Sequence, residues 1–211
     1  MKSGKGMLEA ALFKGRRRFI GVDEVGRGCL AGPVVAGAAA LNWPALQRMT
    51  EKDRGLIRDS KKLSARQRQK ALTLIRHAAG ELSTGSASVE EIETLGIRDA
   101  TFLAMHRALG ACTDRYHTIL VDGRQTIPDR VEAQQALVGG DSLCYSIAAA
   151  SILAKEFRDQ LMRRQAEHWP HWGFDQNVGY GTRQHLDALQ RHGPCPLHRR
   201  NFSPISSMQE R

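Results

Sequence analysis

The sequence predicts an α/β protein with a mixed sheet, and three observations point to this class. Apolar segments of strand length come early in the chain, segments of helical periodicity alternate with them, and residues 166–211 hold only short clusters around one helix. We expect a loose arm over residues 1–16, a main domain over residues 17–165 and a helical extension over residues 166–211. A chain of 211 residues is long enough to bury such a core.

Strands are predicted in four segments of the sequence. The first two, RRFIGVD at 17–23 and PVVAGAAAL at 33–41, are rich in apolar residues and are separated by a turn that contains glycines. A third strand is predicted over ELSTGSASV at 81–89. The strongest signal is YHTILVDG at 116–123, because its aliphatic residues lead directly to an acid and a glycine.

Capping patterns indicate where the helices begin and end. LSARQRQKALTLIRHAAG at 63–80 predicts a helix in which Ser64 and Gln67 form a capping box and Gly80 is the stop. The same pattern recurs at Ser88 and Glu91, which predicts a short helix there. The other predicted helices are 97–112, 145–165 with a small and apolar first half that favours burial, and 179–193 with Thr182 as its cap and Gly193 as its end.

The balance of charge indicates a polyanionic partner. The chain has 31 Lys and Arg against 22 Asp and Glu, a formal net charge of +9. This excess favours nucleic acid first and an anionic membrane second. Charge alone also leaves open a basic protein that is merely soluble.

The cysteines and the N-terminus predict a soluble, cytoplasmic protein with no membrane segment. The four cysteines are widely spaced and form no C-x-x-C pair, which favours reduced, buried thiols over a zinc site. The first apolar run is short and is interrupted by Glu9, unlike a signal peptide. The longest nearly apolar run, residues 29–41, is too short to span a bilayer.

Acidic residues stand at the ends of two predicted strands. Asp23 and Glu24 end the first strand, and Asp122 ends the fourth. Open α/β sheets place their chemistry at strand ends, although Asp122 with Gly123 could also form an ordinary turn. Asp141 lies in a Gly-Gly-Asp-Ser stretch before the long predicted helix, where it could instead be a plain N-cap.

These acids together predict a metal site. Adjacent acids such as Asp23 and Glu24 repel each other unless a cation lies beside them. Carboxylate oxygens suit Mg²⁺ or Mn²⁺. In a basic protein, the surface would gather a polyanion and the metal would act on its phosphates.

Basic residues in predicted loops leave two alternatives open. Lys61 and Lys62, in the stretch DSKKLS, could contact phosphate, and solvated lysines are the equal alternative. Arg199 and Arg200, in the stretch HRRNF, could contact a duplex backbone or hold the C-terminal extension to the main domain.

A series of motifs runs through nearly the whole chain. They are GVDEVGRGCLAGPVVAGA at 21–38, RDSKKLS at 58–64, ILVDG at 119–123, GGDSLCYSIAAASILAKEFRD at 139–159, GYGTRQHL at 179–186 and GPCPLHRRNFSP at 193–204. In this order and spacing they resemble the ribonuclease HII family, the type 2 ribonucleases H. Their joint occurrence is much more specific than any one motif.

The resemblance implies a ribonuclease H-like fold, with a five-stranded mixed sheet flanked by helices and a C-terminal helical extension that contributes to substrate binding. It implies a two-metal site for Mg²⁺ or Mn²⁺ and cleavage of the RNA strand of RNA–DNA hybrids. It also implies incision 5′ of single ribonucleotides embedded in duplex DNA, which leaves 3′-hydroxyl and 5′-phosphate ends. The implied processes are ribonucleotide excision repair and DNA replication, carried out by a monomer with no obligate protein partner.

The resemblance also implies roles for individual residues. Asp23, Glu24, Asp122 and Asp141 match the metal-binding catalytic acids. The residues that match substrate-binding positions are Gly26, Arg27 and Gly28 in the loop that contacts the ribose 2′-hydroxyl, and Tyr180, which helps to recognise the RNA-to-DNA junction.

The chain departs from the family pattern at a few positions, none of which removes a carboxylate. Cys29 stands where proline is usual, Cys144 where serine is frequent and Glu156 where an apolar residue is common. Two further hypotheses remain. One is a nucleic-acid-binding module with the same fold and no catalysis. The other is the sister family ribonuclease HIII, which we disfavour because that family carries an extra N-terminal domain.

Overall fold

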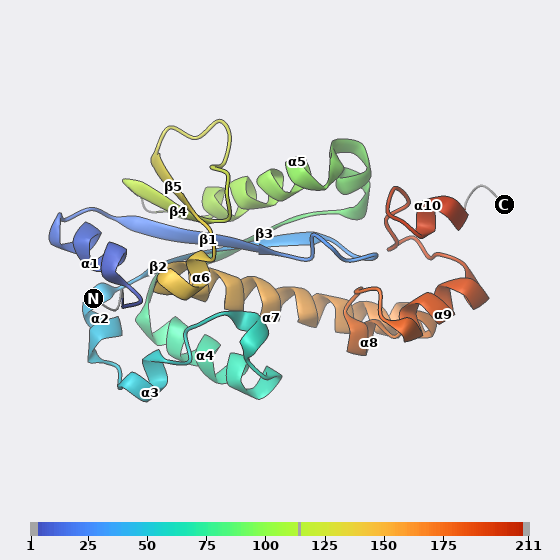
Figure 1. Ribbon diagram of the computed structural model, residues 1–211, viewed down its shortest axis with the longest axis horizontal. Helices are drawn as coiled ribbons and strands as arrows, with labels where there is room; N and C mark the ends of the chain where they lie inside the picture. The colour runs from blue at the N-terminus through green and yellow to red at the C-terminus, as the bar shows by residue number, and fades with distance from the viewer. Residues whose placement is uncertain (1–3, 114, 209–211) are drawn as a thin grey trace.

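A mixed sheet with helices on both faces forms the centre of the molecule (Figure 1). The computed structural model describes residues 4–113 and 115–208. The sheet order is β3-β2-β1-β4-β5, with antiparallel pairs on the β3 side of β1 and parallel pairs on the β5 side. The strands are β1 Phe19–Val25, β2 Val34–Leu41, β3 Ala79–Ala87, β4 Thr118–Asp122 and β5 Ala133–Leu137.

The helices form two layers and a C-terminal group. Helix α5 covers one face of the sheet, α4 and α7 cover the other, and α8 and α9 lie at the C-terminal end of α7 (Figure 1). The long helices are α4 Ala65–Ala78, α5 Val89–Gly110 and α7 Tyr145–His168. The shorter ones are α1 Met7–Lys14, α2 Trp43–Arg48, α3 Glu51–Arg54, α6 Gly140–Leu143, α8 Phe174–Asn177, α9 Arg183–His192 and α10 Ile205–Met208, with 3-10 turns η1 Ser60–Lys62 and η2 Pro170–Trp172.

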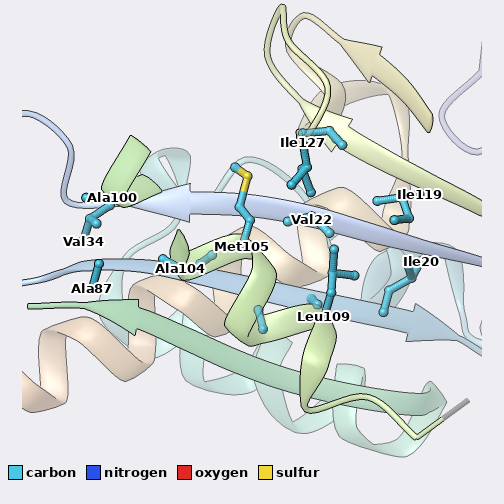
Figure 2. Close-up of a cluster of buried hydrophobic side chains, with 14 of the residues drawn as sticks. Ile20, Val22, Val34, Ala87, Ala100, Ala104, Met105, Leu109, Ile119 and Ile127 are labelled. Atoms are coloured by element: carbon cyan, nitrogen blue, oxygen red, sulfur yellow. The ribbon is translucent and has the colours of Figure 1, made fainter. Parts of the chain in front are cut away.

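The core on the α5 face is built from alternate residues of the central strands. Ile20 and Val22 of β1 and Ile119 of β4 meet Met105 and Leu109 of α5, and all of them are buried (Figure 2). This alternation follows from the period of two in a strand, so the intervening residues of β1 face α7.

Helix α7 packs unusually close to the sheet. A Cβ atom added at Gly21 of β1 would lie 2.3 Å from the Ser146 carbonyl carbon, and one added at Gly37 of β2 would lie 2.3 Å from the Ala150 carbonyl oxygen. Side chains at these positions would push the helix away. The close approach brings the buried first half of α7 against the strand that carries Asp23.

The predicted capping boxes are present. Ser64 caps α4 through the Gln67 amide, and Ser88 caps α5 through the Glu91 amide, each with the reciprocal side-chain bond. The stop at Gly80 was wrong, because α4 ends at Ala78 and Gly80 already belongs to β3. The two helices predicted over 88–112 are both present and together carry the label α5; they meet at Gly96, whose φ of 76° and ψ of 157° are not helical.

Strand β5 and helix α1 were not predicted from the residues, and neither were the short helices α2, α3, α6, α8 and α10. Strand β5 at the sheet edge has the sequence AQQAL and is largely accessible, so it carries little apolar alternation. Residues 7–14, which we expected to belong to a loose arm, form helix α1, and its Glu9 is buried.

The C-terminal group has its own apolar cluster. Met162 at the end of α7 packs with Trp172, Phe174 and Leu189, and Trp172 meets Trp169 edge to face at 6.0 Å.

Three of the cysteines, Cys29, Cys144 and Cys195, are buried and free, as we expected. None of the helices in residues 4–113 and 115–208 combines the length and apolarity that a membrane span needs.

Candidate active site

The four predicted acids lie at one end of the central strands. Val22 of β1 pairs with Val121 of β4 in the parallel register, so Asp23 and Asp122 are the next residues of two adjacent strands. Asp23 is buried and hydrogen-bonds to Ser151 of α7. The side chain of Glu24, one residue on, lines a cleft beside α5.

Asp141 reaches this place from the other direction. It lies in α6, and the backbone N–H of its neighbour Gly140 donates to Asp122 Oδ1 at 2.7 Å. The alternative of a plain N-cap is not supported, because Cys144 is the N-cap residue of α7 and Asp141 lies inside the preceding helix.

The charges of these acids act on one another. Burial raises the pKa of Asp23 well above its usual value, and the charges of Glu24 and Asp122 raise it further. Burial also raises the pKa of Glu24 and the pKa of Asp122. The charge of Asp141 raises the pKa of Asp122 further. A cation beside the group would relieve this repulsion.

The donor chemistry fits a hard divalent cation, since the acids offer carboxylate oxygen and no thiolate or imidazole. No cluster of three or more His, Cys, Asp or Glu side chains in the described part of the chain is already arranged to hold a metal ion. The fit therefore rests on the type of donor and on the mutual repulsion of the acids. Their role as ligands stays a prediction.

A cleft of about 400 Å³ opens beside the acids, between α5 and the loop that follows β4. Its lining residues include Glu24, Arg27, Phe102, Asp122 and Arg124. The cleft thus combines carboxylates and arginines, which suits a ligand that carries phosphates near a metal.

The Gly-Arg-Gly loop after β1 lies directly beside the acids. Arg27 is exposed and pairs with Glu24 at 3.3 Å between Nη1 and Oε1. Gly26 has φ of 91°, and a Cβ there would lie 2.3 Å from Arg158 Nε, so only glycine fits. Gly28 is exposed, with open space around its Cα.

Two buried arginines bond the main chain of this loop and of the residues that follow it, up to Pro33. Arg199 donates to the carbonyl oxygens of Gly26, Arg27 and Gly32 at 2.7 to 3.0 Å. Arg158 donates to the carbonyl oxygens of Ala31, Pro33 and Val178 at 2.7 to 2.9 Å. Of our two alternatives for Arg199, the structure supports the one in which it joins the C-terminal extension to the main domain.

Tyr180 lies in a second loop that is bonded to the first. The N–H of Leu30 donates to the Gly179 carbonyl oxygen at 2.8 Å, which joins the two loops side by side. The Tyr180 ring is 38% exposed, and the Lys155 ammonium lies 5.5 Å from its centre. The structure therefore places Tyr180, which is partly exposed, next to the segment that continues the Gly-Arg-Gly loop.

Lys155 belongs to a buried group of charges. It pairs with Asp159 at 2.8 Å, and Arg68 of α4 bonds Asp159 at 3.3 Å and Glu156 at 2.7 Å. Glu156, which departs from the family pattern, thus has a partner that ties α7 to α4.

Two histidines connect the Tyr180 loop to the C-terminal segment. The Cys195 N–H donates to His198 Nδ1 at 2.9 Å, so His198 carries its proton on Nε2 and donates to His185 Nε2 at 2.9 Å. His185 Nδ1 then donates to the Tyr180 carbonyl oxygen at 2.9 Å. Burial lowers the pKa of both rings, that of His198 to about 4.

The two lysines of η1 differ in their surroundings. Lys61 is close enough to the acids for its charge to lower the pKa of Asp122, whereas Lys62 lies 3.8 Å from Asp59. Both lysines are exposed, so phosphate contact stays a prediction for each.

Ser151, Arg158 and the histidine pair are residues that we did not single out as part of the site. A serine within an otherwise small, apolar helix was a usable signal for Ser151, because a buried hydroxyl needs a partner. The Ser60 hydroxyl also meets that of Ser151, at 3.0 Å, which links the η1 turn to Asp23.

Comparison with known proteins agrees with the six motifs. A family model described as Ribonuclease HII matches residues 20–205. The Ribonuclease HII of Sphingopyxis alaskensis is 49% identical over 191 residues, which covers 90% of this chain and 91% of the relative.

Solved structures share the fold at low sequence identity. The ribonuclease H2 from Pyrococcus horikoshii OT3 has a TM-score of 0.70 and 22% identity, and the match covers 92% of this chain and 97% of that one. Bst-RNase HIII in complex with Mn²⁺ has a TM-score of 0.67 and 17% identity, and the match covers 92% of this chain and 70% of that one.

Proposed function

Because this chain belongs to the ribonuclease HII family, we propose that it incises duplex DNA on the 5′ side of single embedded ribonucleotides as well as cleaving the RNA strand of RNA–DNA hybrids. The chain has the ribonuclease H-like fold and is a metal-dependent endoribonuclease that hydrolyses phosphodiester bonds. The proposed products carry 3′-hydroxyl and 5′-phosphate ends.

One observation carries the proposal. The Gly-Arg-Gly loop and the Tyr180 loop are bonded to each other, and the former follows the acid pair Asp23–Glu24 directly. Groups suited to phosphate chemistry therefore lie beside backbone that can approach a sugar closely. A binding module without catalysis, our alternative, would gain nothing from acids that raise one another's pKa.

In the proposed reaction, Asp23, Glu24, Asp122 and Asp141 would hold Mg²⁺ or Mn²⁺ in a two-metal site. The metals supply activation of the attacking water and stabilisation of charge on the attacking and leaving oxygens. The Mn²⁺ complex of the structural neighbour Bst-RNase HIII supports a divalent cation.

The remaining residues would bind and orient the nucleic acid. The loop from Gly26 to Gly28, in which Arg27 and Gly28 are exposed, would approach the ribose, whose 2′-hydroxyl is the local group that separates RNA from DNA. The partly exposed Tyr180 ring would rest against the next sugar, where a deoxyribose fits and a 2′-hydroxyl would crowd it. Lys61 would neutralise a phosphate without reading sequence.

Cleavage of a DNA duplex with one ribonucleotide tests the proposal directly. We expect a single cut 5′ of the ribonucleotide in Mg²⁺ or Mn²⁺, and none in EDTA or on an all-DNA duplex. Asp122→Asn should abolish cleavage without unfolding the chain, whereas Asp53→Asn on α3 should cleave like wild type. An active Asp122→Asn enzyme, or equal cutting of the all-DNA duplex, would contradict the proposal.

The same proposal extends to the binding partners of the protein, its location in the cell and its domains. We propose that the substrates are the binding partners, that the protein works as a cytoplasmic monomer with no obligate protein partner, and that it serves ribonucleotide excision repair and DNA replication. The division into a catalytic domain over residues 17–165 and a substrate-binding extension over 166–211 is also proposed.

A further inference from the structure

The segment before β1 contacts the backbone that carries Asp141. This segment, residues 5–9, precedes the part of the chain that the family model matches. The Lys5 ammonium donates to the Asp141 carbonyl oxygen, and the Gly6 N–H donates to the Leu143 carbonyl oxygen at 2.8 Å. The segment is thus bonded to the short helix α6 at two points.

Glu9 continues the contact into α7. Its carboxylate accepts from the N–H groups of Tyr145 and Ser146 at 2.8 Å each, and from the Ser146 hydroxyl at 2.6 Å. The first N–H groups of a helix have no partner within the helix, and Cys144 supplies no side-chain cap to α7. Glu9 is buried and takes the place of that cap, where its negative charge also suits the helix dipole.

The packing around Lys5 and Gly6 leaves little freedom. The Lys5 ammonium lies 5.1 Å from the centre of the Tyr145 ring. A Cβ atom added at Gly6 would lie 2.9 Å from the Tyr145 ring and 3.0 Å from the Trp43 ring. The turn before α1 therefore packs against the first residue of α7.

Asp141 is consequently held from two sides. On the sheet side, its neighbour Gly140 bonds Asp122 Oδ1. On the other side, Lys5 and Gly6 bond the carbonyl oxygens of residues 141 and 143, and Glu9 fixes the helix that follows. A carboxylate that arrives on a four-residue helix needs such support, because so short a helix has little stability of its own.

We propose that Lys5 and Glu9 are positioning residues that set the place of Asp141 relative to the other acids. This inference rests on the proposed function, in which Asp141 is a metal ligand. Groups that orient a ligand from behind commonly change metal affinity or activity by 10- to 100-fold when removed.

The test uses Lys5→Met and Glu9→Gln in the full chain, with Lys14→Met as the matched control because Lys14 is an exposed lysine at the far end of α1. Three quantities are compared: Mn²⁺ affinity by calorimetry without nucleic acid, kcat and KM on the ribonucleotide duplex, and hydrogen exchange at the amides of residues 145 and 146. We expect Lys5→Met to lose about tenfold in Mn²⁺ affinity and in kcat with KM unchanged. Glu9→Gln should also speed exchange at both amides, and Lys5→Arg should recover part of the loss.

Wild-type Mn²⁺ affinity and kcat in both Lys5→Met and Glu9→Gln, or equal losses in Lys14→Met, would overturn the inference. A general loss of fold would appear as a lowered melting temperature with KM and kcat changed together, and that result would also count against a positioning role. A wild-type chain that binds Mn²⁺ but cuts no ribonucleotide would overturn the proposed function alone, and the Mn²⁺ comparison would still decide the role of Lys5 and Glu9.

Discussion

Arg158 and Arg199 are the largest fully buried side chains in the described part of the molecule. The bonds that the structure shows from both guanidinium groups end on main-chain carbonyl oxygens. A guanidinium spreads five donors over three nitrogens in one rigid plane and can bond several carbonyls of a turn at once, whereas the three donors of a lysine all sit on one nitrogen. These arginines therefore fix the shape of the loop that we propose reads the ribose.

Replacing Arg199 with lysine tests whether its hydrogen bonds hold the Gly-Arg-Gly loop in place. Arg199→Lys keeps the positive charge but leaves at least one of the Gly26, Arg27 and Gly32 carbonyls without its donor. We expect a loss of about 2 kcal/mol in the free energy of unfolding, measured in urea. Cleavage should fall while Mn²⁺ affinity stays within twofold of wild type, because the arginine touches no acid ligand. A parallel fall in Mn²⁺ affinity would contradict this division of labour.

Tyr180 allows a test of how the junction is chosen. Tyr180→Ala should lose most cleavage at a single embedded ribonucleotide and less on a long RNA strand paired with DNA, where many registers are available. Tyr180→Phe should remain close to wild type if the ring and not its hydroxyl matters. Equal losses of Tyr180→Ala on both substrates would instead indicate general support of catalysis or folding.

Single residues also show where sequence reasoning ends. The positions of the four acids could be predicted because three of them stand at the ends of strands β1 and β4 and the fourth lies shortly before the long helix α7. The role of Arg199 could not, since HRRNF fits an exposed basic patch as well as a buried brace. Only the tertiary fold, which brings residue 199 beneath residues 26–32, decides between them.

At the level of elements, the His185–His198 pair joins helix α9 to the segment that carries Arg199. Both rings are neutral in the folded state, and burial holds the pKa of His198 at about 4 against about 6.5 unfolded. The unfolded chain then binds a proton that the folded chain does not. The stabilisation is complete above pH 6.5 and is lost as pH falls towards 4.

The pair predicts a pH-dependent stability. Wild type should lose roughly 1.5 kcal/mol more between pH 6.5 and 5 than His198→Gln, because the unfolded ring goes from half to nearly full protonation over this range while the folded ring stays mostly neutral. Urea unfolding at the two pH values measures the difference. His77→Gln, at an exposed histidine of α4, is the control and should follow wild type. Identical slopes for His198→Gln and wild type would refute the neutral pair.

Element prediction succeeded where local signals were strong. The capping boxes fixed the starts of α4 and α5 because cap and amide lie three residues apart. Strand β5 and helix α1 depend on partners far away in sequence. β5 is paired along β4, and α1 is held by Glu9 against α7, so neither could be read from its own composition.

For the whole molecule, the net charge of +9 predicts binding that depends on salt. Log Kd against log salt should have a slope of about 0.9 per phosphate neutralised. Lys61→Ala should make that slope shallower by about one unit, because its charge faces the acids and thus the proposed scissile region. Lys70→Ala, at a lysine already paired with Asp53, should leave it unchanged. An unaltered slope in Lys61→Ala would show that Lys61 is a solvated lysine that contacts no phosphate.

The bond between Arg199 and the Gly26 carbonyl also sets an order of events during protein synthesis. The two residues are 173 positions apart, so the ribosome adds Arg199 roughly 10 to 30 s after Gly26. Asp23, Glu24, Asp122 and Asp141 are all added before it. A growing chain thus contains the four acids before it contains the arginine that fixes the loop that we propose reads the ribose. We therefore expect that loop to reach its final shape only after all four acids have been synthesised.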